Sequence, residues 1–128
     1  MNNYVFEPGL LPSRFLFPEV YHRILGQKVL PDLDPWWFLC IDQESSLFWL
    51  ETLKEQFPER SLVPFAKLSD SDDLACFDGS DTSGNPKVLY IHAYTSPGWE
   101  HRGEAADFEH WLQEAKADSE EYQAQLSS

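Results

Sequence analysis

The centre of the chain, residues 61–112, alternates short apolar runs with polar segments rich in turn-forming residues. Short apolar runs bounded in this way are typical of β-strands. They predict three strands, Leu62–Ala66, Leu74–Phe77 and Lys87–Ala93. Pro64 lies within the first run. Because proline cannot donate a hydrogen bond to a neighbouring strand, it predicts an edge position or a bulge there.

Apolar residues recur at helical spacing in three further segments. The spacing predicts helices over Phe15–Leu25, over Ser45–Phe57 and from about Ala105–Asp107 onward. Pro18 fits the first turn of the first helix, where a missing N–H group has no cost. Ser45 or Ser46 is suited to cap the start of the second helix, and Pro58 ends it.

The remaining segments complete the predicted fold. Trp36–Ile41 is a continuous apolar run, which predicts a strand buried on both faces. We expect residues 1–14 to be irregular, Thr95–Gly103 to form a loop, and residues 119–128 to be a polar tail that frays. Helices and strands do not alternate regularly in this order. The pattern therefore predicts an α+β fold, a single domain over residues 1–128 with a largely antiparallel mixed sheet and helices packed against one face.

The composition adds a strong acidic bias to this picture. Hydrophobic residues make up 42% of the chain and aromatic residues 15%, which is enough for a dense core. The formal net charge is −13: residues 1–67 hold nine acidic and six basic residues, whereas residues 68–128 hold thirteen acidic and three basic ones. Such a field repels nucleic acid and anionic membranes and attracts basic partners. The alternative is that this charge only keeps the protein soluble.

The cysteines and the start of the chain indicate its compartment. Cys40 and Cys76 lie inside apolar runs, and we expect two buried free thiols rather than a disulfide or a metal pair. Met1 is followed by Asn, Asn and Tyr, without the basic and apolar regions of a signal peptide. No apolar run approaches the ~20 residues of a membrane span. These features predict a cytoplasmic protein.

Known catalytic and metal-binding motifs find no match. Three histidines recur at a regular interval that fits no metal-binding spacing, His92, His101 and His110. The loop that begins at Asp78 lacks the alternate carboxylates and the glycine of a calcium loop. We therefore expect no catalytic residue, no metal and no cofactor. A small hydrolase that uses Cys40, Cys76 or carboxylates remains an alternative.

Four segments in the centre of the chain together resemble the SUKH superfamily, in the branch named after a fungal cell-wall synthesis regulator and its bacterial homologues. They are Leu62–Ala66 (LVPFA), Leu74–Asp78 (LACFD), Lys87–His92 (KVLYIH) and Phe108–Leu112 (FEHWL). The likeness rests on their order and spacing over about fifty residues. In one departure, the turn before the second segment reads Ser71-Asp72-Asp73, where the family often has a glycine.

The resemblance implies a mixed α+β domain that binds proteins and carries no catalytic residues. Many bacterial members are immunity proteins that each neutralise a toxin, often a nuclease. Together with the acidic charge of the chain, the resemblance implies a basic toxin domain as the partner and neutralisation of that toxin by occlusion. A regulatory or scaffold module with another partner is the alternative. We expect a monomer or a weak dimer.

The candidate partner-binding residues lie in the polar loops. They are Asp70, Asp72, Asp73, Asp78, Asp81, Trp99 and Glu100. The aspartates serve either as docking points for Lys and Arg or as solvated turn residues. Trp99 is either an exposed anchor, joined by Tyr94, or a residue that folds back to hold its loop. Because alternate connections of a meander lie at opposite ends, residues 70–73 and 78–81 would flank one strand rather than form one patch.

Overall fold

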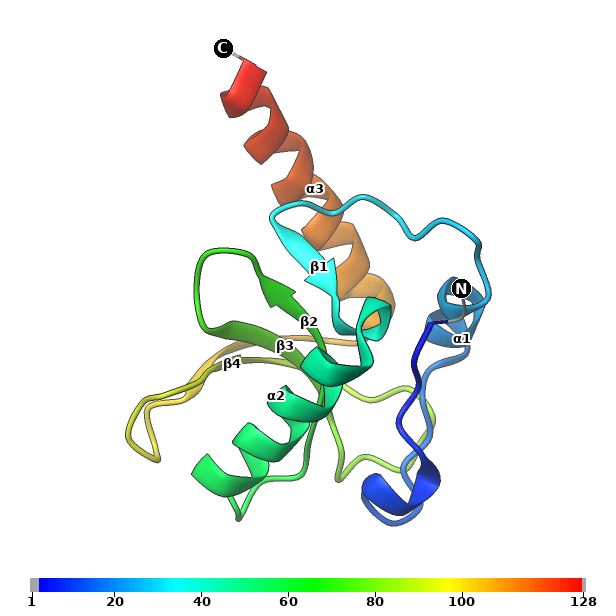
Figure 1. The fold of residues 1–128 in the computed structure, drawn as a ribbon, viewed down its shortest axis with the longest axis vertical. Coiled ribbons are helices and arrows are strands. Elements are labelled where there is room, and N and C mark those ends of the chain that lie inside the picture. The colour runs from blue at the N-terminus through cyan, green and yellow to red at the C-terminus, as the bar shows by residue number, and fades with distance from the viewer. Residues whose placement is uncertain (1–2, 128) are drawn as a thin grey trace.

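A computed structural model describes residues 3–127. In these residues an antiparallel five-stranded sheet runs in chain order and is flanked by three α-helices (Figure 1). The strands are β1 (Trp36–Phe38), β2 (Leu62–Leu68), β3 (Asp73–Asp78), β4 (Val88–His92) and β5 (His101–Ala105). The helices are α1 (Glu19–Leu25), α2 (Gln43–Gln56) and α3 (Phe108–Ser127), with 3₁₀ turns at Pro8–Leu10 and Leu39–Ile41. The predicted α+β class is confirmed.

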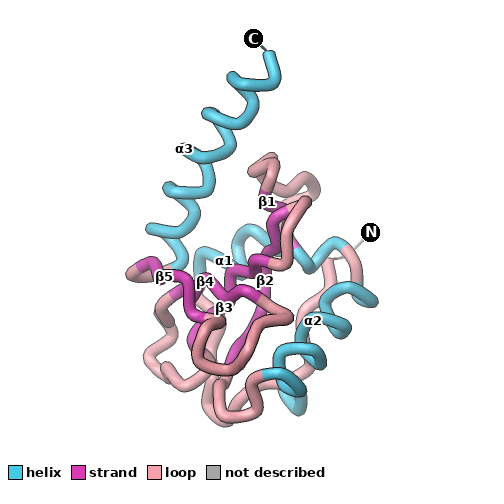
Figure 2. The backbone as a smooth tube through the Cα atoms, turned by 90° about the vertical axis from the view of Figure 1, so that its left-hand side faces the viewer, coloured by secondary structure: helices cyan, strands magenta, loops and turns pink. Residues whose placement is uncertain are grey.

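Both faces of the central strands are buried. Side chains alternate between the two faces of a strand, so Ala75 and Phe77 of β3 enter one hydrophobic cluster while Leu74 and Cys76 enter another. Helices α1 and α3 cover the first face. Helix α2 lies beside β2, where Trp49 and Leu53 cover part of the second face while Leu50 reaches the first (Figure 2). The expectation that the helices cover one face is wrong, because strands that are apolar on both sides require two covers.

The first face is packed with aromatic rings. Phe65 of β2 lies at its centre: its ring stacks on Phe77 with centroids 4.3 Å apart and meets the edge of Trp111 of α3 at 4.8 Å. Phe108 and Tyr21 complete the cluster from α3 and α1. Burial of such large rings provides most of the stabilisation available to a domain of this size.

The second face is covered by α2 and by the segment that precedes it. Trp49 and Leu53 of α2 and Phe57 just after it pack over Leu74 and Ile91 of the sheet. The sheet thereby fixes both the position of α2 and which side of that helix faces solvent.

The predicted strand Trp36–Ile41 is wrong in its second half. Only Trp36–Phe38 pairs with β2, and Leu39–Ile41 forms a 3₁₀ turn that leads into α2. The Ser46 hydroxyl donates to the Leu39 carbonyl (2.6 Å), which ties this turn to the helix. Helix α2 begins at Gln43 rather than at Ser45. A continuous apolar run shows burial but not the point at which the backbone turns.

The sequence pattern did not predict strand β5, which begins inside the predicted loop Thr95–Gly103. Its sequence, HRGEA, is mostly polar, and four of its five residues are at least partly exposed because β5 is an edge strand. Without a buried face it has no apolar alternation for sequence reasoning to detect.

Helix α3 differs from its prediction at both ends. It begins at Phe108, and the carboxylate of Asp107 accepts the backbone N–H of His110 at 2.9 Å, as a capping residue does. It continues through Ser127, so fraying from residue 119 is wrong (Figure 1). Ser119 is buried and accepts a hydrogen bond from Gln123, which supports the added turns. Position 128 lies outside the described residues.

Pro64 and the N-terminal segment are two further places where the sequence made a prediction. The bulge predicted at Pro64 is confirmed, since the β2–β3 register shifts between Pro64 and Ala66. Strand β2 is central rather than at the edge, but β1 pairs only with Ala66–Leu68 and leaves Pro64 without a neighbouring strand on that side. Residues 3–14 are irregular apart from the short turn Pro8–Leu10, and residues 1–2 lie outside the described part.

Replacing Gly79, just after β3, by alanine tests how closely the loops pack. A Cβ atom there would lie 2.6 Å from Pro12 Cγ and 2.8 Å from the Ser61 carbonyl oxygen. Overpacking of this kind costs about 1–3 kcal/mol, so we expect the free energy of unfolding in urea to fall by that amount. Gly9→Ala is the matched control, because a Cβ there meets no described atom within 4 Å. Equal stability of the two variants would contradict this packing.

Candidate protein-binding surface

The sheet separates the predicted site residues into two groups. The β2–β3 turn (69–72) and the β4–β5 loop (93–100) lie at one end of the sheet, and the β3–β4 loop (79–87) lies at the other. Asp70, Asp72 and Asp73 are thus roughly 17 Å, the length of β3, from Asp78 and Asp81. The aspartates flank one strand instead of forming one patch.

In the β3–β4 loop the aspartates shape the backbone. The Asp78 carboxylate accepts the backbone N–H and the hydroxyl of Ser80, at 3.0 and 2.6 Å. Asp81 accepts the backbone N–H of Ser83 at 2.9 Å, and hydrogen bonding from Ser83 lowers the pKa of Asp81. These contacts are the turn-forming role that short acidic side chains have in many loops.

The β2–β3 turn offers two carboxylates to solvent. Asp73 accepts from the Ser71 hydroxyl (2.9 Å) and lies 2.8 Å from Nδ1 of His92. By contrast, the carboxylates of Asp70 and Asp72 make no hydrogen bond within residues 3–127. These two are therefore free to meet a charged partner.

The β4–β5 loop exposes a tryptophan beside a buried carboxylate. Trp99 is 72% exposed, so its ring does not fold back onto the loop. Its neighbour Glu100 is 3% exposed and accepts the backbone N–H of Gly98 and Nε–H of Arg60, both at 2.6 Å. A partner would meet the loop that Glu100 holds rather than its carboxylate.

The electrostatics of Glu100 follow from these contacts. Burial acts to raise its pKa, but hydrogen bonds from the backbone N–H groups of Glu100 and Gly98 and from Arg60 outweigh burial and hold the pKa below its usual value. The carboxylate therefore stays charged and keeps the loop tied to the segment that connects α2 and β2.

Two backbone hydrogen bonds fix the start of the same loop. The N–H of Ala93 donates to the Asp72 carbonyl (3.0 Å), and the N–H of Tyr94 donates to the Gln56 side chain of α2 (2.7 Å). Tyr94 has a φ of 58°, in the left-handed region that non-glycine residues rarely adopt. Its ring remains 57% exposed. The loop is thus preorganised against both the β2–β3 turn and α2.

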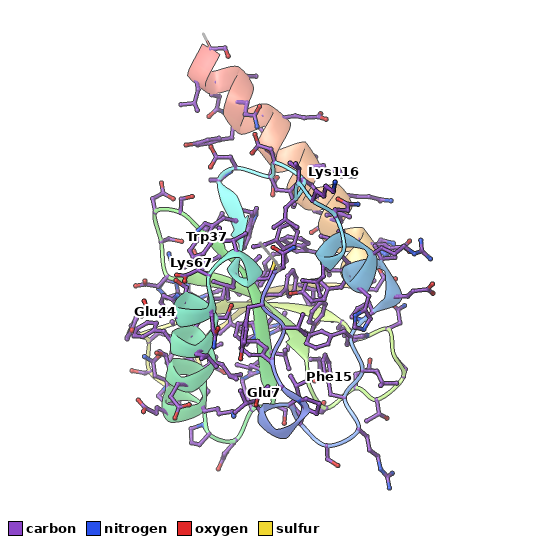
Figure 3. All side chains as sticks on the ribbon, turned by 45° about the vertical axis from the view of Figure 1, so that its right-hand side comes forward. Glu7, Phe15, Trp37, Glu44, Lys67 and Lys116 are labelled. Carbon is purple, nitrogen blue, oxygen red and sulfur yellow. The ribbon has the colours of Figure 1, made fainter. Side chains whose placement is uncertain are left out.

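Sequence reasoning missed one exposed aromatic residue, Phe48 of α2, which is 52% exposed. The helical pattern placed Leu47, Leu50 and Leu53 on the buried stripe. Phe48 falls outside that stripe, one turn from Glu44 and three residues before Glu51. The sequence did contain a signal for its exposure, since Phe48 lies between acidic residues on the solvent-exposed face of the predicted helix. Figure 3 shows Glu44 on α2 on the same side of the molecule as Trp37 and Lys67.

The two cysteines are buried free thiols, as predicted. Burial raises the pKa of Cys40 to about 11 and that of Cys76 further, so neither is an effective nucleophile at neutral pH. Within residues 3–127, no three His, Cys, Asp or Glu side chains are grouped to hold a metal ion. No helix in that range has the length and apolar character needed to cross a bilayer.

Comparison with known protein families matches most of the chain to one family model. The family model described as the SMI1 / KNR4 family (SUKH-1) matches residues 14–114, which include every strand and helices α1 and α2. No curated protein and no solved structure matches the chain.

Glu100→Gln tests whether the ion pair with Arg60 holds the β4–β5 loop. At neutral pH we expect the free energy of unfolding to fall by about 2 kcal/mol, because charged hydrogen bonds in a buried site are lost. The low pKa of Glu100 means that its stabilisation is present above the usual carboxyl pKa of 4.5 and is lost as the pH falls through the folded-state value. The difference between variant and wild type in urea denaturation should therefore shrink in acid.

The control is Glu59→Gln, which neutralises a neighbouring exposed carboxylate and should change stability by less than about 0.5 kcal/mol. A Glu100→Gln variant as stable as the control at neutral pH would show that the ion pair does not hold the loop.

Proposed function

Because the chain belongs to the SMI1/KNR4 (SUKH-1) family, we propose that it is a non-catalytic immunity protein that binds a basic, nuclease-type toxin domain and blocks it by occlusion. Domains of this family are generally non-catalytic, and the family suggests a protein-interaction module. The buried, weakly acidic thiols of Cys40 and Cys76 give no support to a thiol hydrolase.

One observation carries this proposal: Trp99 is exposed on a loop that is tied down at both ends. Large aromatic residues are enriched among the residues that dominate binding energy. A loop that is already ordered loses less entropy when a partner binds. Arg60 and Gln56 anchor this loop through Glu100 and Tyr94. Trp99 is therefore a side chain that a partner can bury at low cost.

Asp70 and Asp72, at the same end of the sheet as Trp99, favour a partner of positive charge. Near the anchored loop, Asp70 and Asp72 add two carboxylates that have no partner within residues 3–127, and the backbone carbonyl of Asp72 accepts the N–H of Ala93. The whole chain carries a net charge of −13. Charge of one sign raises the association rate with a partner of the opposite sign and suppresses others. A nucleic-acid-cleaving domain with a basic surface fits this field.

A growth assay tests the proposal. We expect a nuclease-type toxin domain among the genes that neighbour its own; the chain is co-expressed with that domain, and survival is measured. We expect the wild type to protect, and Trp99→Ala to protect less because the complex dissociates faster. The chain and the toxin domain should also elute together as a stable complex on gel filtration. Failure of the wild type to protect would contradict the immunity role, and a stable complex without protection would favour a regulatory module instead.

Charge reversal at the β2–β3 turn tests the steering. In a variant that combines Asp70→Lys and Asp72→Lys, we expect the rate of association with the toxin domain at low salt to fall about ten-fold. The salt dependence of this rate should also weaken, because fewer favourable charge pairs steer the encounter. Stopped-flow kinetics over a range of ionic strength provide the measurement. Glu120→Lys with Glu121→Lys, on the distal part of α3, is the matched control for net charge. Equal rates for the two double variants would refute local steering.

A further inference from the structure

Two exposed aromatic rings contact one buried ring where α2 meets the β4–β5 loop. The Phe48 ring meets the Trp49 ring edge-on with centroids 5.1 Å apart, and the Tyr94 ring also meets Trp49, with centroids 6.0 Å apart. Trp49 itself is buried, while Phe48 and Tyr94 are more than half exposed. We name these three residues the aromatic ridge. It joins α2 to the anchored β4–β5 loop.

A groove lies along the Phe48 side of the aromatic ridge. Its volume is about 510 Å³, and it runs between α2 and the turn at Pro8–Leu10. Its lining is mainly apolar with a few polar side chains, namely Leu10, Leu47, Phe48, Leu50, Glu51, Thr52 and Glu55. The groove is large enough for an apolar side chain of a partner, with Phe48 as one wall.

The charge around the aromatic ridge is mostly negative. Helix α2 contributes three exposed carboxylates, Glu44, Glu51 and Glu55, of which the last two also line the groove. The β2–β3 turn adds Asp70 and Asp72 beyond Tyr94. No cation paired with these five carboxylates is found in residues 3–127.

Two lysines lie near the aromatic ridge, and both are engaged with backbone carbonyls. Lys54 donates to the Leu10 carbonyl at 3.4 Å. Lys67 donates to the carbonyls of Ser71 and Leu68, at 2.6 and 2.8 Å, and its ammonium lies 5.7 Å from the Trp49 ring centroid. The Lys67 contact shows that the face of Trp49 already accepts a cation. The five carboxylates outnumber these two ammonium groups, so the local charge stays negative and favours a partner that brings positive charge.

We propose that the aromatic ridge and its groove form the docking surface for a basic partner segment in which one apolar or aromatic side chain is flanked by Lys or Arg. The apolar side chain fills the groove against Phe48, and the flanking cations meet Glu51 and Glu55. Charge complementarity selects this occupant over a second copy of the chain, whose net charge of −13 would oppose self-association through an acidic surface. The proposal rests on the proposed function only for the identity of the natural partner.

A binding experiment with a defined probe tests this surface. The probe is a fluorescein-labelled peptide in which one Trp is flanked by Lys residues, and its affinity for the full chain is measured by fluorescence anisotropy at low ionic strength. We expect Phe48→Ala to weaken binding about ten-fold, since it removes one wall of the groove. Phe48→Lys should weaken it further by adding a like charge. Val29→Ala, at an 82% exposed apolar position away from α2, should leave the affinity unchanged.

The charge requirement has its own control. Glu51→Gln with Glu55→Gln should lower the salt dependence of peptide binding, whereas Glu120→Gln with Glu121→Gln on α3 should not. A second peptide with Glu in place of Lys should not bind. Absence of binding to the wild type, equal affinity of the Phe48 variants and the wild type, or equal binding of the acidic peptide would overturn the proposal.

The growth assay separates this inference from the proposed function. If the wild type protects cells and Phe48→Ala protects equally well, the docking surface is overturned while the immunity role remains. If the wild type fails to protect, the immunity role fails, and peptide binding then decides the docking surface alone.

Discussion

The central strands β2 and β3 are apolar on both faces. Val63, Phe65 and Phe77 require a cover on one side, and Leu74 and Cys76 require another on the opposite side. A sheet with only one cover would leave a row of large side chains in water, at a cost of about 25 cal/mol for each Å² of apolar area. The positions of α1, α3 and α2 follow from this requirement.

The second cover creates the candidate surface. Helix α2 reaches only part of the second face, and the β4–β5 loop lies against its C-terminal half through Gln56 and Tyr94. Where the helix and the loop meet, Trp49 is buried between Phe48 and Tyr94, whose rings remain exposed. The same arrangement places Arg60 next to Glu100. The packing of the core thus determines which aromatic side chains a partner can reach.

Sequence reasoning predicted the parts of this fold that have strong periodicity. Leu62–Ala66, Leu74–Phe77 and Lys87–Ala93 were predicted as strands, and an edge position or a bulge at Pro64 followed from its missing N–H. Strand β5 was missed because HRGEA buries only Ala105 and so shows no apolar alternation. The split of the aspartates followed from meander geometry. The pairing of Arg60 with Glu100 joins residues forty positions apart, and no local pattern encodes it. Phe48 was visible in the sequence, but the ring contact that makes it part of a surface was not.

The central claim is that the exposed aromatic residues of α2 and the β4–β5 loop contact a basic partner. The chain has five tryptophans, and we expect each indole N–H group to give its own signal in a ¹H–¹⁵N spectrum. The most direct test is a titration of the labelled chain with a toxin domain against which it protects cells in the growth assay. We expect the signals of Trp99 and Trp49 to shift while that of Trp111, in the core on the other face of the sheet, does not. Unchanged Trp99 and Trp49 signals on formation of the complex would contradict this claim.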